Sequence, residues 1–434
     1  MMREIYDCIG VGFGPANIAL AVMMREARFQ GTVLFLERSL APDWQPGMLL
    51  EGSDIQHNPL RDFATPRNPR SRYGFLSYLE SVGRLFDFLN LDQPFPPRTE
   101  YAGYVRWVAE QFAESVCYGE EVRSIQLDRS RGADLYRIES SDGTVRWARA
   151  VSFGPGRSPL MPEIFAGANP KRVLHASQYL FGLNEIAREG APESLAIVGA
   201  SQSAVEIALD LLGRYPDIEL HLIWRGQGVK LKDTSPFTEH IYFPDFVDYF
   251  HSSSEEVQRK LSTDLWRSNY GAADHDVISS LYLKLYEQKV SGRIRIHPRP
   301  FSEITDVACD GKRVVLSLNE RNRDLGGSMS VDGVIVATGY KNFGAGEGRE
   351  PFHPLLRDVA EHARRRGDGS LHVARDFRLV GAGHRHLPPL FVNGLCESTH
   401  GFGDAGSFSL LSVRAATIYD ALMGSLLESM SAAE

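Results

Sequence analysis

The chain has 434 residues, of which 43% are hydrophobic and 24% are charged, and its formal net charge is −8. This length suits two or three domains with a large core, and the negative charge argues against a general nucleic-acid binder or a protein of anionic membranes. The four cysteines form no CxxC pair, and no uncharged apolar run is long enough to span a bilayer. We therefore expect no disulfide framework, no metal site and no membrane span, and a cytoplasmic protein.

The chain begins with the pattern of a βαβ unit. The apolar run "YDCIGVG" ends in glycines, "PANIALAVMMREA" has helical spacing, and "GTVLFLERS" predicts a second strand. Gly10, Gly12 and Gly14 let the backbone approach a pyrophosphate at the helix N-terminus, and Pro15 fits the first turn of that helix. Glu37 ends the second strand, where a carboxylate binds ribose hydroxyls. The pattern predicts a dinucleotide site; a tight turn without a ligand is the alternative.

A second βαβ pattern follows a segment, 40–110, whose proline, arginine and aromatic residues predict irregular structure. It lies in "SLAIVGASQSAVEIALDLLGRYPDIELHLIWRG", where Gly199, Ser201 and Ala204 occupy the positions of a G-x-G-x-x-A turn. Its second strand ends in Arg225 instead of an acid, and a cation there suits the 2′-phosphate of NADPH. A solvated surface arginine is the alternative.

The rest of the chain completes an α/β fold with two dinucleotide-binding, Rossmann-like domains and a small, mostly helical substrate-binding region. "VDGVIVATGY" predicts a strand that leads back to the first domain, and "SFSLLSVRAATIYDALMGSLLESM" predicts an amphipathic helix. Two dinucleotide folds in this order indicate a flavoprotein with FAD in the first and a nicotinamide in the second. The predicted limits are 1–180 and 331–434 for the FAD-binding domain, and 181–330 for the NADPH-binding domain, which includes the helical region 233–290.

Several stretches together resemble the N-hydroxylating flavin monooxygenases, the ornithine and lysine N-monooxygenases of siderophore pathways. They include "GVGFGPANIALAV", "QHNPLRDFATPRNP", "VGASQSAVEIALDLL", "DTSPFTEHIYFP", "SNYGAADHDVI", "IVATGY" and "STHGFGDAGSFSLLS". The resemblance follows the order of the family and covers nearly the whole chain. It implies a role in siderophore or antibiotic biosynthesis.

The resemblance implies that NADPH reduces FAD, that molecular oxygen then gives a C4a-hydroperoxyflavin, and that a neutral primary amine is oxidised to a hydroxylamine. The protein would supply binding, orientation and exclusion of water. It also implies a homo-oligomer, a dimer or a tetramer, with no nucleic-acid or membrane partner. We expect no catalytic side chain beyond the flavin itself.

Matching motifs assign residues to the two cofactors. The cofactor set comprises Gly10, Gly12, Gly14, Pro15, Glu37, Trp44, Gln56, His57, Gly199, Ser201, Gln202, Ser203, Arg225, Thr338, Gly339, Tyr340 and Leu410. Of these, Trp44, Gln56 and His57 are expected beside the flavin.

The substrate set comprises Arg61, Glu239, Asn269 and Ser409, and it contains the departures from the family pattern. Arg61 stands where the family has a lysine that holds the substrate carboxylate, and Glu239 stands where it has an asparagine. The family's "THGLSxxLLS" is lengthened here to "THGFGDAGSFSLLS". Because these departures gather at the substrate end, we expect an anionic amine, such as an acidic amino acid or an aminoalkyl phosphonate.

Three alternatives stay open. The first is hydroxylation of the side-chain amine of ornithine or lysine. The second is another two-cofactor flavin monooxygenase that acts on sulfur or on a carbonyl, although "FGPGRSPLMP" lacks the usual Baeyer–Villiger histidine. The third is a non-catalytic flavin-binding protein. A disulfide reductase is disfavoured, because the chain has no CxxC or CxxxxC pair.

Overall fold

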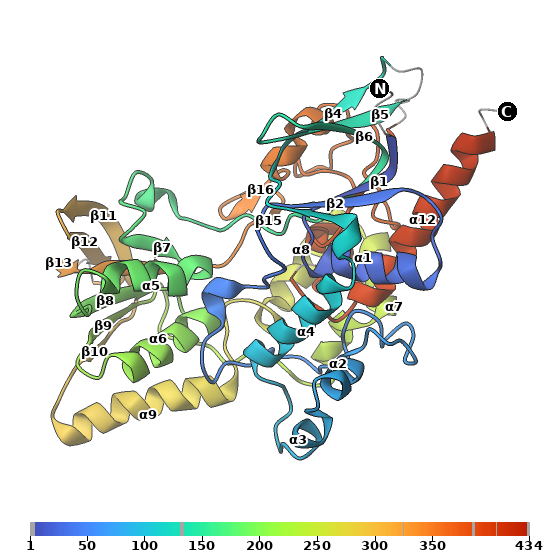
Figure 1. The fold of residues 1–434 in the computed structure, drawn as a ribbon. Coiled ribbons are helices and arrows are strands. Elements are labelled where there is room, and N and C mark those ends of the chain that lie inside the picture. Colours follow the sequence, from blue (N-terminus) through green and yellow to red (C-terminus); the bar gives the residue numbers. More distant parts are fainter. Residues whose placement is uncertain (1–4, 131–133, 324, 384–386, 405, 432–434) are drawn as a thin grey trace.

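The computed structural model describes residues 5–130, 134–323, 325–383, 387–404 and 406–431. Their strands fall into two main sheets, which lie in different parts of the molecule (Figure 1). The predicted α/β class with parallel sheets is confirmed. None of the helices within the described ranges has the length and apolar content needed to cross a membrane.

The first glycine turn lies at the centre of the first sheet, whose strand order is β3-β2-β1-β6-β5-β4, with β17 paired to β6. β1, β2, β3, β6 and β17 run parallel, and β4 and β5 continue the sheet as antiparallel strands. Because parallel strands end at one edge, the turns after β1 and β6 and the end of β2 meet there. The strands are β1 (Ile5–Val11), β2 (Val33–Glu37), β3 (Val116–Tyr118), β4 (Val122–Asp128), β5 (Leu135–Ser140), β6 (Val145–Phe153) and β17 (Leu390–Val392).

Helices from both ends of the chain cover this sheet. α1 (Pro15–Glu26) packs along α12 (Leu411–Ser431), the C-terminal helix predicted from the sequence (Figure 1). Ile18 and Leu20 of α1 and Ile418 and Leu422 of α12 are buried in the same core. The remaining helices of this part are α2 (Phe75–Ser81), α3 (Leu85–Leu89), α4 (Arg98–Glu110), α10 (Arg357–Ala360) and α11 (Glu397–His400).

The second sheet is entirely parallel, in the order β10-β9-β8-β14-β7. Its core βαβ unit, made of β8, α6 and β9, confirms the second predicted unit. The elements are β7 (Val173–His175), β8 (Ser194–Val198), β9 (Glu219–Ile223), β10 (Ile296–Arg299), β14 (Gly333–Val336), α5 (Tyr179–Ala187) and α6 (Gln202–Arg214). Both β7 and β14 pair in this sheet, although the predicted limits assign them to the first domain. β7 and β14 belong to this sheet because β14 pairs with both β7 and β8, strands that are distant from it in sequence. The domain limits stay a prediction.

The segment 233–290 is mostly helical, as predicted, and it spans both parts of the molecule. α7 (Pro244–Ser252) packs against α11, and α9 (His275–Ser291) packs along α6, with α8 (Glu255–Asp264) between them in sequence. A small antiparallel sheet follows, made of β11 (Ser302–Asp310), β12 (Arg313–Glu320) and β13 (Leu325–Val331). A short parallel pair, β15 (Asn342–Phe343) and β16 (Arg349–Glu350), follows β14.

Candidate functional site

The first glycine turn requires glycine at Gly12. Its φ is +80°, and a Cβ there would lie 2.6 Å from the carbonyl oxygen of Gly154, at the end of β6. At Gly14 a Cβ would meet nothing within 4 Å, and this residue caps α1 ahead of Pro15 without a side chain. The turn therefore presents open backbone at a helix N-terminus, which suits a pyrophosphate.

A buried asparagine holds this turn in place. The Nδ2 of Asn17 donates to the carbonyl oxygen of Gly12 at 2.6 Å, and its Oδ1 accepts from Ser152 Oγ at 2.6 Å. The Nδ2 of Asn393 donates to the same Oδ1 at 3.1 Å. The turn is thus tied to β6 and to the chain after β17. The motif-based prediction did not include Asn17; an amide among the apolar residues of "PANIALAV" was its only signal.

A pocket of about 70 Å³ lies in front of the turn. Gly14, Pro15, Glu37 and Trp44, all predicted cofactor residues, line it together with Phe13. Glu37 Oε2 accepts from the backbone N–H of Phe13 at 2.7 Å, which fixes the carboxylate beside the turn. A carboxylate at the end of β2 beside open helix N–H groups is the donor and acceptor set that FAD needs.

An aromatic wall connects this pocket to the predicted substrate residues. Phe408 stacks on His57 at 5.4 Å and meets Trp44 edge-on at 5.3 Å. Burial lowers the pKa of His57 to about 4, so its ring is neutral at physiological pH. Its Nε2 is buried and has no partner among the described residues. An unpartnered nitrogen in this wall fits a polar atom of a bound flavin. The Nε2 of Gln56 donates to Asp274 at 2.6 Å.

The structure brings three of the four predicted substrate residues into contact. Arg61 Nη1 lies 3.2 Å from Glu239 Oε2 and 3.3 Å from Ser409 Oγ, and both charged side chains are partly exposed. The Arg61 guanidinium also lies 5.7 Å from the ring centre of Tyr242, whose hydroxyl lies 3.3 Å from the Ser268 carbonyl oxygen and 3.4 Å from Asn269 Oδ1. Tyr242, which was not predicted, thus links Asn269 to the other three. The negative charge of Glu239 offsets the positive charge of Arg61, so this pair is neutral, whereas Arg61 alone would make the site cationic.

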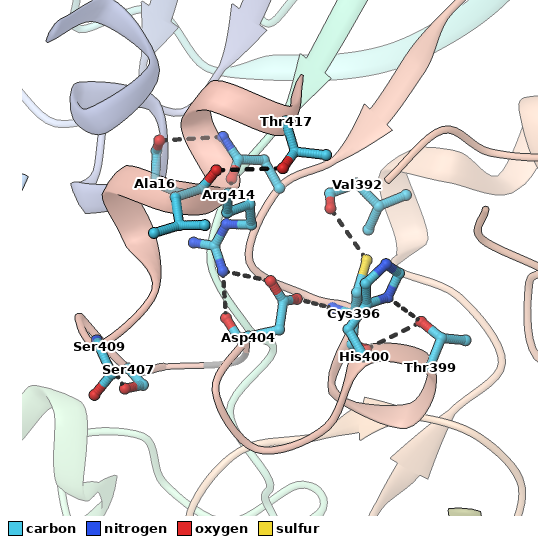
Figure 2. Close-up of polar contacts among 12 residues, drawn as sticks. Ala16, Val392, Cys396, Thr399, His400, Asp404, Ser407, Ser409, Arg414 and Thr417 are labelled. Atoms are coloured by element: carbon cyan, nitrogen blue, oxygen red, sulfur yellow. Dashed lines mark hydrogen bonds and ion pairs between the residues drawn. The ribbon is translucent and has the colours of Figure 1, made fainter. Parts of the chain in front are cut away.

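Buried polar contacts anchor the lengthened loop between α11 and α12 (Figure 2). Asp404 forms a buried ion pair with Arg414 of α12 and accepts from the backbone N–H of Cys396 at 2.6 Å. Arg414 Nε in turn donates to Asn393 Oδ1 at 2.9 Å, so the loop and the first glycine turn share one polar network. Leu410, predicted to contact cofactor, is buried against Gly403 in this loop. His400 is buried and stacked on Phe377, a structural position.

The second glycine turn repeats the geometry of the first. Gly199 has a φ of +139°, and a Cβ there would lie 2.3 Å from the carbonyl oxygen of Ala337. Ser201 caps α6 without using its side chain, so its hydroxyl is not committed to the helix. The Gln202 side chain, in contrast to that of Ser201, is hydrogen-bonded within the protein, because its Oε1 accepts from the backbone N–H of Asp274 at 2.8 Å. Ser203 lies in the first turn of α6. The side chains that pack beside Gly199 are mostly apolar, namely Ala204, Val205, Leu222, Trp224, Val229 and Leu281.

Arg225 lies two residues after β9 and is exposed. It forms an ion pair with Glu347 at 3.4 Å. A weak exposed pair leaves the guanidinium accessible to a phosphate. The position is the one that the NADPH prediction requires. The cation therefore fits a 2′-phosphate, with Glu347 as a competing anion.

The "ATGY" segment, 337–340, directly follows β14 and leads out of the second sheet. The Thr338 hydroxyl donates to the carbonyl oxygen of Leu160, and the Gly339 carbonyl oxygen accepts from the N–H of Leu160 at 2.9 Å. The Tyr340 ring lies 5.1 Å from the Arg157 guanidinium. These contacts join the segment that follows β6 to the segment that follows β14.

A buried cluster that sequence reasoning missed surrounds Arg157. Arg157 Nη1 donates to the Tyr270 hydroxyl at 2.8 Å, and that hydroxyl donates to Glu397. The Asn342 amide donates to Glu397 at 2.8 Å. Burial raises the pKa of Glu397 to about 7. The four residues come from four distant segments, and no local pattern connects them.

The comparisons with known proteins agree with this geometry. Residues 4–342 match the family model described as L-lysine 6-monooxygenase/L-ornithine 5-monooxygenase. The L-ornithine N(5)-monooxygenase of Burkholderia cepacia is 36% identical over 418 residues, which cover 92% of this chain and 91% of the relative.

Two solved structures are similar over nearly their whole length. Ornithine hydroxylase (PvdA) from Pseudomonas aeruginosa has a TM-score of 0.88 and 34% identity, covering 98% of this chain and 100% of that one. The ornithine N-hydroxylase KtzI of Kutzneria sp. 744, with reduced FAD, NADP+ and L-ornithine, has a TM-score of 0.88 and 30% identity, covering 97% and 99%.

The predicted resemblance is confirmed, and with it the prediction of an FAD- and NADPH-dependent flavin N-monooxygenase. The assignment of the glycine turns, Glu37 and the aromatic wall to the cofactors stays a prediction. The chain belongs to the L-lysine 6-monooxygenase/L-ornithine 5-monooxygenase family.

Proposed function

We propose that the protein hydroxylates the side-chain amine of an α-amino acid, ornithine or lysine, in a siderophore or related biosynthetic pathway. The ion pair between Arg61 and Glu239 carries the proposal. An α-amino acid presents a carboxylate and an ammonium next to each other, and the site presents a guanidinium and a carboxylate next to each other. The names of two relatives support ornithine, and the description of the family adds lysine.

The pairing of charges disfavours the anionic amine expected from the sequence. Glu239 lies 3.2 Å from Arg61, so the two side chains together carry no net charge. An acidic amino acid or a phosphonate would place its second anion against Glu239 without a compensating cation. Side-chain hydroxylation of ornithine or lysine, held above as an alternative, therefore replaces it as our proposal.

Each group of residues has a distinct role in this proposal. Arg61 binds the substrate carboxylate, Glu239 binds the α-ammonium, and Ser409 and Asn269 fix the orientation of the head group. The wall of Trp44 and Phe408 excludes water between this head group and the cofactor pocket. Bound FAD, reduced by NADPH, would activate molecular oxygen, of which one atom is transferred to the amine and the other leaves as water. The side-chain amine must lose its proton before it reacts, because an ammonium has no free electron pair.

The test is a substrate panel in which NADPH oxidation and hydroxylamine formation are measured together. L-ornithine or L-lysine is expected to give hydroxylamine in proportion to NADPH consumed. Diamines, which lack the carboxylate, and N-α-acetyl-ornithine, which lacks the ammonium, are expected to raise KM by tenfold or more. Coupled turnover only with aspartate or an aminoalkyl phosphonate would overturn the proposal.

Two variants separate the two halves of the head-group site. Glu239→Gln removes the partner of the α-ammonium, so the preference for ornithine over N-α-acetyl-ornithine should fall. Arg61→Gln removes the partner of the carboxylate, so the preference for ornithine over the matching diamine should fall. If both variants changed the two preferences equally, the assigned roles would be wrong.

A further inference from the structure

Arg157 is a cation that is held by neutral groups. Its Nη1 donates to the Tyr270 hydroxyl at 2.8 Å and to Asn342 Oδ1 at 3.3 Å. In the part of the chain that the structure describes, no carboxylate pairs with it directly, and Glu397 is linked to it through Tyr270 and Asn342. Nε and Nη2 of Arg157 donate to none of the described residues, and neither nitrogen is fully enclosed. Their N–H groups therefore remain for a ligand.

Two aromatic rings and a glycine fix the orientation of this guanidinium. It lies 5.8 Å from the ring centre of Tyr270 and 5.1 Å from that of Tyr340. Gly406, in the lengthened loop before α12, leaves room beside it, because a Cβ at Gly406 would lie 2.5 Å from Arg157 Nη2. A side chain that is oriented before a ligand arrives loses little entropy on binding, and a planar guanidinium suits phosphate oxygens.

The strand order of the second sheet shows which part of a nucleotide reaches Arg157. β8 is followed directly by Gly199, where a pyrophosphate is expected, and β9 and β14 pair with β8 on its two sides. Arg225 follows β9, so the adenosine half with its 2′-phosphate belongs on that side. Tyr340, against which Arg157 lies, follows β14 on the opposite side. The nicotinamide half is therefore expected at Arg157.

The first sheet reaches the same place. Gly154, whose carbonyl oxygen approaches the first glycine turn, precedes Arg157 by three residues, and Ala337, whose carbonyl oxygen approaches the second turn, precedes Tyr340 by three. The segments that contain them are joined, since the backbone N–H of Lys341 donates to the carbonyl oxygen of Ser158 at 2.9 Å. The short strands β15 and β16, which follow, lie between the two sheets (Figure 1). A nicotinamide brought to Arg157 would thus face the predicted FAD pocket.

We propose that Arg157 binds the nicotinamide half of NADP(H) through the 5′-phosphate of that half. Arg225 and Arg157 then hold the two ends of the nucleotide on opposite sides of the second glycine turn. Tyr270 and Asn342 are positioning residues for Arg157, and Glu397 balances its charge from a distance. This assignment concerns the cofactor and does not depend on which amine the enzyme hydroxylates.

Isothermal titration calorimetry of the oxidised, FAD-loaded protein without any amine tests the proposal. The two ligands are NADP+ and 2′,5′-ADP, which carries the 2′-phosphate but lacks the nicotinamide half. Arg157→Gln is expected to raise the dissociation constant of NADP+ about tenfold and to change that of 2′,5′-ADP less than about twofold. Arg225→Ala should weaken both ligands. Arg188→Gln, at an exposed arginine of α5, is the matched control and should change neither.

Competition against NADP+ separates the phosphate from the rest of the nicotinamide half. Arg157→Gln should weaken nicotinamide mononucleotide and leave nicotinamide riboside, which has no phosphate, unchanged. Arg157→Lys keeps the charge without the planar fork, so its affinity for NADP+ should lie between those of wild type and Arg157→Gln. This variant also serves if Arg157→Gln does not retain FAD.

Three results would overturn the proposal. The first is an unchanged affinity for NADP+ in both Arg157 variants. The second is an equal loss for NADP+ and 2′,5′-ADP, which would mean that the whole nucleotide-binding unit is disturbed. The third is a higher KM for L-ornithine with unchanged NADP+ binding, which would assign Arg157 to the substrate carboxylate. A failure of the proposed substrate would leave all the nucleotide titrations unaffected.

Discussion

The buried ion pair between Arg98 of α4 and Glu206 of α6 joins the two main parts of the molecule, and its removal should be costly. Arg98 Nη2 lies 2.8 Å from Glu206 Oε1, with 9% and 4% of the two side chains exposed. Arg98 also donates to the carbonyl oxygens of Met48 and Asp54, both at 3.1 Å. Glu206 Oε2 is buried without a partner among the described residues.

Arg98→Met would leave the Glu206 carboxylate buried with a single amide donor, Gln202 Nε2 at 3.0 Å. Breaking one side of a buried pair costs about 3–5 kcal/mol, whereas replacing both charges by apolar groups costs much less. We expect the single variant to lose about 3–5 kcal/mol of unfolding free energy and Arg98→Met/Glu206→Met to recover at least half of that loss.

Urea unfolding, followed by tryptophan fluorescence at a fixed FAD concentration, measures the unfolding free energy of each variant. The values are compared between variants whose m-values, the slopes of this free energy against urea concentration, are equal. Arg188→Met is the control, since Arg188 pairs with Glu185 on the exposed surface of α5 and its loss should cost less than about 0.5 kcal/mol. A single variant within 1 kcal/mol of wild type, or a double variant as unstable as the sum of two single losses, would refute the reasoning.

Three further predictions concern the cofactor turns and the buried acid. Gly12→Ala should abolish FAD retention, measured by flavin absorbance, because the added Cβ would lie 2.6 Å from a carbonyl oxygen. Gly83→Ala is the control: Gly83 has a φ of +73°, but an added Cβ would meet no atom within 4 Å, so this variant should keep FAD. Arg225→Ala should raise the KM for NADPH about tenfold and leave that for NADH unchanged, and Glu347→Gln should lower the KM for NADPH; equal effects on both nucleotides would contradict the 2′-phosphate role. Burial raises the pKa of Glu397 from 4.5 to about 7, so the folded state keeps a proton that the unfolded chain releases, and stability falls as pH rises through that window. Glu397→Gln should therefore gain up to about 3 kcal/mol relative to wild type between about pH 5 and about pH 8, by urea midpoints, and a constant difference would exclude this titration.

The two dinucleotide units could be predicted from the sequence because their determinants are local. A strand, a glycine turn and a helix follow one another within about thirty residues, and Gly12 and Gly199 each have a positive φ that other residues adopt at a cost. Glu37 ends β2, and Arg225 follows the end of β9 by two residues, so their places also follow from local order.

The substrate end was decided by contacts between distant segments. Arg61 and Glu239 are recognisable as departures from a family pattern, but only the fold shows that they pair with each other and so cancel the positive charge expected there. The cluster of Arg157, Tyr270 and Glu397 likewise has no signal in any one segment. Short-range spacing fixes the backbone of a turn, whereas the charge of a site depends on which side chains the tertiary structure brings within a few ångströms.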